Sequence, residues 1–399
     1  MTATAPSPSS TCRPAVAGPR RPSGWRALLA VGLVGLCLVA CGPRAAEAPR
    51  ATSAAPAAPS TAPGAAADTG ACDLGATPSP PVKLTFGAPG SSASAGVFVA
   101  IDRGYFQELG LDVQFTPVSA GTELLPALAA SQIEIGAAAP SAGLFNALTR
   151  DVPIRILAEQ DSSVPGRKTV YALVVRKDLW DSGALRDFPD LRGRKIAATG
   201  MGGGSTFEMA TVRVLGRGGL TSADVEVVNL PFPDINRALA TRSIDAAIDI
   251  EPFLTQALEQ ELAQVWLEAD QIWEGASMGS VIMGSPKLVA QPAVATRFML
   301  GYLRGVRDYL DALWFERGDP GAILPSLARY TGIADLGLWA RMRPVWINPE
   351  GRVDLDSIAR RIELNARAGY IRETIEPQNV VDNRFADCAA RALGPYNTP

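Results

Sequence analysis

Residues 83–118 constrain the fold of this 399-residue chain more than any other stretch. Residues 83–86 predict a strand. Apolar side chains then recur every four residues at Val97, Ile101, Tyr105 and Leu109, which predicts a single helix with one apolar face. Gly110 is expected to end this helix in the left-handed conformation, and residues 112–118 to form a second strand. Strand, loop, helix and strand in this order form the unit of a parallel α/β sheet.

The same alternation continues and divides the chain into two α/β lobes. Strands are predicted at 133–137, 154–158 and 171–175, and then at 195–199, 225–229 and 245–250. We place the first crossing between lobes after residue 172 and the return near 279–283. Lobe 1 is therefore expected to comprise residues 82–172 and 280–399, and lobe 2 residues 173–279.

The first 81 residues are not expected to belong to either lobe. Four arginines precede an apolar run at 27–40, which predicts an export signal over residues 1–40. Fourteen apolar residues are too few for a membrane-spanning helix, which needs about 20. Arg20 and Arg21 suggest twin-arginine export, but Pro22 to Gly24 lack the apolar residue usual there, which favours general secretion. Residues 41–81 are rich in Ala and Pro and predict a disordered tether.

Charge and cysteine content narrow the possible partners. The signal holds four of the 37 basic residues and no acid, so 33 basic and 40 acidic residues remain, a formal charge of −7. Nucleic acid is therefore not expected as a partner. After the signal and Cys41, only Cys72 and Cys388 remain. Two cysteines in an exported protein predict a disulfide, and two free thiols are the alternative.

The sequence contains no histidine, which excludes triads that need imidazole and histidine-ligated metals. No pair of carboxylates or lysines has a catalytic spacing, so we expect no enzyme activity, no cofactor and no metal. The loop 200–205 lacks the last glycine of a dinucleotide fingerprint, and the chain has no phosphate-binding Gly-Lys-Ser/Thr loop.

Three loops follow predicted strands and precede predicted helices. Helix N-termini favour anionic or strongly polar groups, and open α/β sheets bind ligands at the carboxyl ends of their strands. Simple N-capping would explain one such loop, but three loops across two lobes favour a binding cleft. Ser205 and Glu208 also have the spacing of a capping box. The candidate ligand-binding residues of these loops are Ser91, Ser92, Ser94, Ser141, Gly204, Ser205 and Thr206.

Several motifs carry a resemblance to a known family, and together they cover nearly all of residues 83–394. They are FGAPGSSASAGVFVAIDRGYFQELGLDVQF, IEIGAAAPSAGLFNAL, DLRGRKIAATGMGGGSTFEM, IDAAIDIEPF and VVDNRFADCAARALG. In order, they resemble the solute-binding proteins of ABC importers for nitrate, sulfonates, taurine and thiamine-type pyrimidines. The resemblance implies a type II periplasmic-binding-protein fold, with two α/β lobes joined by two hinge strands.

The resemblance also implies the function. The protein is expected to be a monomer that captures a small polar or anionic molecule and delivers it to ABC permease transmembrane subunits. The serine and threonine residues of the three loops would line the cleft, with Glu251 or Phe253 at its edge. Residues 38–41 resemble a bacterial lipobox, so Cys41 would carry lipid and hold the exported protein on the membrane, facing the periplasm or exterior.

Two alternative functions and the identity of the ligand remain open from the sequence. Some relatives synthesise the pyrimidine with an active-site histidine, which this chain lacks. A secreted enzyme on the same fold that works without histidine is one alternative function, and a ligand-loaded sensor for a signalling receptor is another. The ligand is also open: helix N-termini favour sulfonate, nitrate or carboxylate, whereas Asp249 and Glu251 would suit an amine or an aminopyrimidine.

Overall fold

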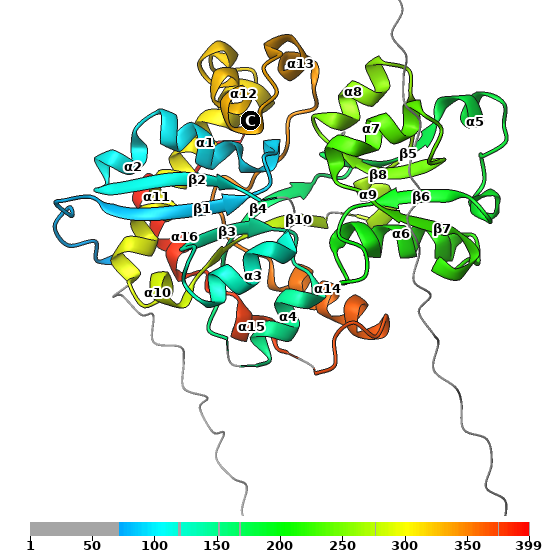
Figure 1. The fold of residues 1–399 in the computed structure, drawn as a ribbon. Helices are drawn as coiled ribbons and strands as arrows, with labels where there is room; N and C mark the ends of the chain where they lie inside the picture. Colours follow the sequence, from blue (N-terminus) through cyan, green and yellow to red (C-terminus); the bar gives the residue numbers. More distant parts are fainter. Residues whose placement is uncertain are drawn as a thin grey trace, which may run out of the picture. The chain divides into compact units, whose positions relative to one another are not determined.

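The computed structural model describes residues 72–118, 121–150, 152–166, 169–275, 277–373 and 375–398. The predicted signal, Cys41 and most of the predicted tether lie outside the described residues. Two five-stranded sheets organise this part of the chain, and helices flank both (Figure 1).

The first sheet is the centre of lobe 1, and its strand order is β2-β1-β3-β10-β4. Strand β1 is parallel to β2 and β3, while β10 is antiparallel to β3 and β4. The strands are β1 (Val82–Ala88), β2 (Leu111–Pro117), β3 (Ile135–Ala138), β4 (Arg155–Ser163) and β10 (Ser277–Gly284). The helices are α1 (Ala95–Asp102), α2 (Tyr105–Glu108), α3 (Gly121–Ala129), α4 (Ala142–Leu148), α10 (Pro286–Val289), α11 (Pro292–Tyr309), α12 (Leu324–Thr331), α13 (Leu336–Arg341), α14 (Leu355–Arg367), α15 (Pro377–Val380) and α16 (Arg384–Leu393).

The second sheet is the centre of lobe 2, and its order is β7-β6-β8-β5-β9. Strand β6 is parallel to β7 and β8, while β5 is antiparallel to β8 and β9. The strands are β5 (Tyr171–Arg176), β6 (Lys195–Ala198), β7 (Glu226–Asn229), β8 (Ala246–Ile250) and β9 (Ala263–Glu268). The helices are α5 (Lys177–Asp181), α6 (Thr206–Arg217), α7 (Phe232–Ala240), α8 (Phe253–Glu259) and α9 (Ala269–Trp273). The predicted two-lobed α/β fold is confirmed.

Both faces of the lobe 1 sheet are packed. Neighbours in β4, Ile156 and Leu157, belong to different apolar clusters, as do Ile282 and Met283 in β10. Alternate residues of a strand point to opposite faces, so one cluster lies on each face. Helices α1 and α11 pack together within the first cluster, and a Cβ at Gly305 would overlap a backbone carbonyl of α1.

The helix predicted from Val97 to Leu109 is not continuous, and this part of the prediction was wrong. Gly104 adopts a left-handed conformation with φ of 74°, so the chain turns between α1 and α2. The helical spacing persists across the turn because both short helices bury their apolar side chains on α11. Gly110, with φ of 72°, ends α2 as predicted.

The segment 72–81, assigned to the tether from its composition, is attached to lobe 1. The predicted disulfide joins Cys72 to Cys388 in α16, with 5.2 Å between the Cα atoms. The Arg297 guanidinium also donates to the carbonyl oxygens of Leu74, Gly75 and Ala76 at 2.7–3.0 Å. Residues 72–81 therefore belong with lobe 1.

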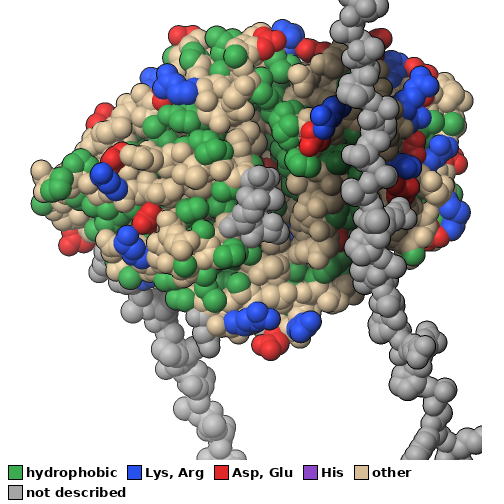
Figure 2. Space-filling model, in the orientation of Figure 1, with side chains coloured by type: hydrophobic (Ala, Val, Ile, Leu, Met, Phe, Trp, Pro, Cys, Tyr) green, Lys and Arg blue, Asp and Glu red, His purple; other side chains and the backbone are tan. Residues whose placement is uncertain are grey.

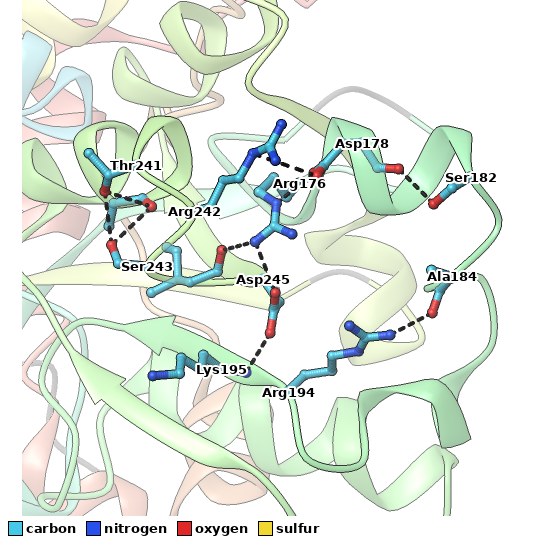
Figure 3. Close-up of polar contacts among 12 residues, drawn as sticks. Arg176, Asp178, Ser182, Ala184, Arg194, Lys195, Thr241, Arg242, Ser243 and Asp245 are labelled. Atoms are coloured by element: carbon cyan, nitrogen blue, oxygen red, sulfur yellow. Dashed lines mark hydrogen bonds and ion pairs between the residues drawn. The ribbon is translucent and has the colours of Figure 1, made fainter.

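A network of hydrogen bonds and ion pairs lies at the amino end of β8 in lobe 2 (Figure 3). Asp245 accepts a hydrogen bond from the Arg176 guanidinium at 3.0 Å and from the backbone N–H of Lys195 at 3.0 Å. Arg176 also pairs with Asp178 at 2.5 Å. Over the face of the molecule shown in Figure 2, acidic and basic side chains are interspersed, and neither sign forms a large patch.

Candidate ligand-binding site

A cavity of about 80 Å³ lies between the two lobes, at the carboxyl ends of β1, β3, β6 and β8. Both lobes supply its walls. The lining residues are Pro89, Ser91, Ala93, Ser94, Ala137, Ala138, Ala139, Gln160, Asp161, Val170, Tyr171, Phe207, Phe232, Ile250, Gly279 and Ser280. We call this space the interlobe cavity.

The polar wall of the interlobe cavity comes from lobe 1 and the hinge strands β4 and β10. The Ser280 hydroxyl donates to the Asp161 carboxylate and lies 2.7 Å from the Gln160 amide oxygen. The Gln160 amide nitrogen donates to the Ser94 hydroxyl at 3.0 Å. Asp161 is 3 % exposed, and burial raises the pKa of its carboxyl to about 6, against the lowering effect of the Ser280 hydrogen bonds.

The apolar wall comes from lobe 2. The rings of Tyr171 and Phe207 meet edge to face with centroids 5.6 Å apart, and those of Phe207 and Phe232 do so at 5.1 Å. Ile250, at the carboxyl end of β8, completes this wall. Aromatic side chains in the wall of a cavity suit a flat ligand group, because rings pack well against one another in offset or edge-to-face arrangements.

Two of the three predicted serines in the first loop line the interlobe cavity. Ser91 and Ser94 do so, and Ser94 is held by Gln160 as described. Ser92 is fully buried and is absent from the lining, and its hydroxyl has no hydrogen-bond partner. The loop thus brings two hydroxyl groups to the cavity just before α1.

The second predicted loop contacts lobe 2, and its candidate residue, Ser141, is not among the lining residues although Ala138 and Ala139 are. Ser141 caps α4, where its hydroxyl accepts from the Leu144 N–H at 3.3 Å. The next residue, Ala142, donates its N–H to the Gly204 carbonyl oxygen at 3.3 Å. Ser141 and Gly204 are therefore brought close to each other across the lobes, and neither is a lining residue.

The glycine-rich third loop folds around a carboxylate of the protein itself. Glu208 accepts hydrogen bonds from the backbone N–H groups of Gly202, Gly203 and Gly204 at 3.0, 3.0 and 2.6 Å. The hydroxyl of Tyr370, from lobe 1, donates to the same carboxylate at 2.7 Å. Only half of the predicted capping box forms, since Ser205 accepts from the Glu208 N–H at 3.1 Å while the Glu208 side chain reaches the glycines instead.

Neither predicted polar residue at the start of α6 lines the interlobe cavity. The Ser205 hydroxyl donates to the Thr199 carbonyl oxygen at 3.1 Å. Thr206 is fully buried, and its hydroxyl accepts from the Arg361 guanidinium at 3.0 Å. Arg361 comes from α14 of lobe 1, so this contact too joins the lobes.

The acidic residues predicted at the cleft edge lie beside the hinge. Glu251 is fully buried, accepts from Thr255 at 3.0 Å, and lies 3.6 Å from Arg343, which also pairs with Glu268 at 2.7 Å. Burial raises the pKa of Glu251 to about 7. Asp249 is also buried, and burial raises its pKa well above the usual range. Phe253 begins α8 and packs on the apolar core.

Sequence reasoning missed the residues that give the interlobe cavity its character. Asp161 follows a strand predicted to end at residue 158, and its polar neighbours resemble a loop. In the structure β4 runs on to Ser163 as a hinge strand, with Glu159, Gln160 and Asp161 all buried. Phe207 and Phe232 lie just inside α6 and α7, and their positions after strands were the available signal.

Within the described residues, no group of three or more His, Cys, Asp or Glu side chains has the geometry of a metal site. In the same part of the chain, no helix has the length and apolar character needed to cross a membrane.

The chain is similar in sequence to one protein family and to a periplasmic binding protein. A family model described as "NMT1/THI5 like" matches residues 91–312. The taurine-binding periplasmic protein of Escherichia coli (strain K12) is 24% identical over 249 residues, which is 61% of this chain and 72% of that protein.

Solved structures share the fold. The alkanesulfonate-binding protein SsuA of Xanthomonas axonopodis pv. citri, bound to MOPS, matches with a TM-score of 0.59 and 19% identity over 77% of this chain and 100% of that one. The periplasmic nitrate-binding protein NrtA of Synechocystis PCC 6803 matches with a TM-score of 0.62 and 16% identity, over 78% of this chain and 89% of that one. The desulfurization enzyme DSZB matches with a TM-score of 0.55 and 15% identity, over 78% of this chain and 100% of that one. The fold is therefore also found in an enzyme.

Proposed function

Because the chain belongs to the NMT1/THI5-like family, we propose that it is the solute-binding component of an ABC importer. It would capture a small molecule between its lobes and deliver it to the transmembrane permease. The proposal extends to this chain what its relatives are: periplasmic binding proteins for taurine, alkanesulfonate and nitrate.

The observation that carries the proposal is the interlobe cavity. Its walls come from both lobes and from the two hinge strands, so a ligand there would contact both halves at once. Binding would then favour the arrangement in which the lobes are together, because only that arrangement offers both walls. Direct bonds between the lobes, such as Tyr370 to Glu208 and Arg361 to Thr206, would support the same arrangement.

The ligand classes that follow from the family are sulfonates, nitrate, taurine and pyrimidines. The loop serines Ser91 and Ser94 would hydrogen-bond the polar part of the ligand, and the aromatic residues of lobe 2 would contact its flat or apolar part. Binding would involve no change in the covalent structure of the ligand. Two facts support a non-enzymatic role: the sequence has no histidine, and Cys72 and Cys388, the cysteines of the described part, are bonded to each other.

The proposal includes export and membrane attachment. The signal over residues 1–40 would be removed, Cys41 would carry lipid, and the monomeric folded part would lie outside the cytoplasm on a tether. Replacing Cys41 by Ser should release the protein from membranes without a change in ligand affinity, because anchor and cavity are on separate parts of the chain. Fractionation of cells expressing the variant measures this, and continued membrane association would refute lipidation at Cys41.

A thermal-shift screen of small metabolites tests the function. A ligand present at about 100 times its dissociation constant should raise the free energy of unfolding by roughly 2.7 kcal/mol. Each ligand found is then incubated with the protein and recovered. Recovery unchanged, together with loss of uptake in cells lacking the protein, supports a binding component of an importer. Conversion of the ligand to a product would refute it in favour of an enzyme.

A further inference from the structure

The interlobe cavity has one feature that the anionic ligand classes do not explain, namely its charge. Among the described residues that line it, Asp161 has an acidic side chain that can carry a negative charge, and no lysine or arginine is present. Nitrate and sulfonates carry a negative charge, which would lie against this carboxylate, itself only 3 % exposed. Opposite charges are favoured and like charges are penalised most strongly where water is excluded.

Two groups near the cavity that could attract an anion are already bonded within the protein. The three N–H groups of the glycine loop are bonded to Glu208. The nearest buried cation, Arg361, donates to Thr206 at 3.0 Å and to the Met278 carbonyl oxygen at 2.7 Å, and lies 4.6 Å from the Trp273 ring. Arg361 offsets part of the Asp161 charge through space but is not among the lining residues.

The polar wall offers both donors and acceptors, since the hydroxyls of Ser91 and Ser94 and the second amide hydrogen of Gln160 can donate, while the ionised Asp161 carboxylate can only accept. Gln160 uses its amide nitrogen on Ser94 and its amide oxygen on Ser280. The single proton of the Ser280 hydroxyl is directed at Gln160 and Asp161, so this hydroxyl has none left for a ligand. A carboxylate can accept about four hydrogen bonds, so Asp161 retains capacity for N–H donors.

We propose that Asp161 is the counter-ion for a protonated nitrogen of the ligand, and that the cavity selects a small molecule in which this nitrogen is joined to a flat, largely apolar ring. The ring would lie against Tyr171, Phe207 and Phe232, whose faces also attract cations. This inference rests on the proposed function and narrows its ligand class. It replaces Asp249 and Glu251, which lie outside the cavity lining, as the residues that would meet an amine.

Matched probes of similar shape and opposite charge test the inference. Benzamidine and benzoate share a flat ring and differ in the charge of the attached group. Isothermal titration should show binding of benzamidine, and of the related cations benzylamine and 4-aminopyridine, but not of benzoate, benzenesulfonate, taurine or nitrate at the same concentrations. Asp161→Asn should weaken the binding of the cations by at least about 30-fold, as expected for the loss of a buried charge partner.

Asp245→Asn is the matched control. Like Asp161, Asp245 is a carboxylate, and it is bonded to a guanidinium and a backbone N–H (Figure 3). It lies at the amino end of β8, whereas Ile250, which lines the cavity, lies at the carboxyl end. Its replacement should leave cation affinity unchanged. Circular dichroism and the melting temperature of each variant show that both are folded.

Three results would overturn the inference: tighter binding of an anion than of the cations, failure of every cation to bind, or equal affinities of wild type and Asp161→Asn. The first would leave the binding-protein function in place, because a ligand would still be captured. Failure of the function itself would appear differently, as conversion of a ligand to product or as unaffected uptake in cells without the protein.

Discussion

Replacement of Glu208 by Gln should destabilise lobe 2 strongly for a conservative change. Glu208 is 4 % exposed. One carboxylate oxygen accepts from the Gly202 N–H and the Tyr370 hydroxyl, and the other accepts from the N–H groups of Gly203 and Gly204. In glutamine one of these oxygens becomes an NH₂ group. In the first position this group would face the Gly202 N–H, because the Tyr370 hydroxyl can turn to accept, and in the second it would face the N–H groups of Gly203 and Gly204. At least one backbone donor is therefore left without an acceptor whichever way the amide turns.

The size of the effect follows from that count. A buried donor left without an acceptor costs about 1–3 kcal/mol, and bonds to a charged acceptor are worth more than neutral ones. One such donor, together with the loss of the negative charge that strengthens the remaining bonds, gives an expected loss of about 1–3 kcal/mol. Glu208→Ala removes both acceptor oxygens, leaves all four donors without this partner and should cost at least as much.

Urea unfolding followed by circular dichroism measures the loss. Glu226→Gln is the control, because Glu226 in the same lobe lies on an exposed edge strand and pairs with Lys195 at the surface. That control should unfold close to wild type. A Glu208→Gln variant within about 0.5 kcal/mol of wild type would refute the reasoning, since a difference that small is usual for surface substitutions away from special features.

Two further predictions concern closure and pH. Tyr370→Phe removes the hydroxyl that joins lobe 1 to Glu208 and should weaken ligand binding about tenfold by titration, with a preserved fold; unchanged affinity would mean that this bond does not favour the closed arrangement. Burial raises the pKa of Glu159 from 4.5 to about 7. Between these pH values the carboxyl holds a proton in the folded state that it has lost in the unfolded state. Its contribution to the free energy of unfolding therefore falls as pH rises through this range. The stability of Glu159→Gln relative to wild type should therefore increase across that range in urea titrations, and a difference independent of pH would contradict the assignment.

The sequence predicted the fold well because its signals are local and repeated. Apolar strands, glycines at helix ends and the alternation of strand and helix do not depend on distant contacts. The exception, the break at Gly104, arose because two short helices bury the same apolar face as one long helix would. Periodicity alone cannot detect a turn that keeps the face aligned.

The candidate site was predicted less completely because its polar residues have partners far away in the chain. Ser205 and Thr206 were expected at a ligand, yet Glu208 and Arg361 occupy the groups that a ligand would use, and Arg361 is 155 residues from Thr206. The polar run after residue 158 reads as a loop, although it continues β4 as a hinge strand. Only the tertiary structure shows that Asp161 is enclosed.

The attachment at Cys72 has a mechanical consequence. Tension that arrives from the preceding chain would pass through the disulfide into α16 and through the Arg297 contacts into α11, and both helices belong to lobe 1. Strand β1, which begins at Val82, would not be peeled from its sheet. Lobe 2 lies off this path, so neither the hinge strands nor the bonds between the lobes would be loaded directly.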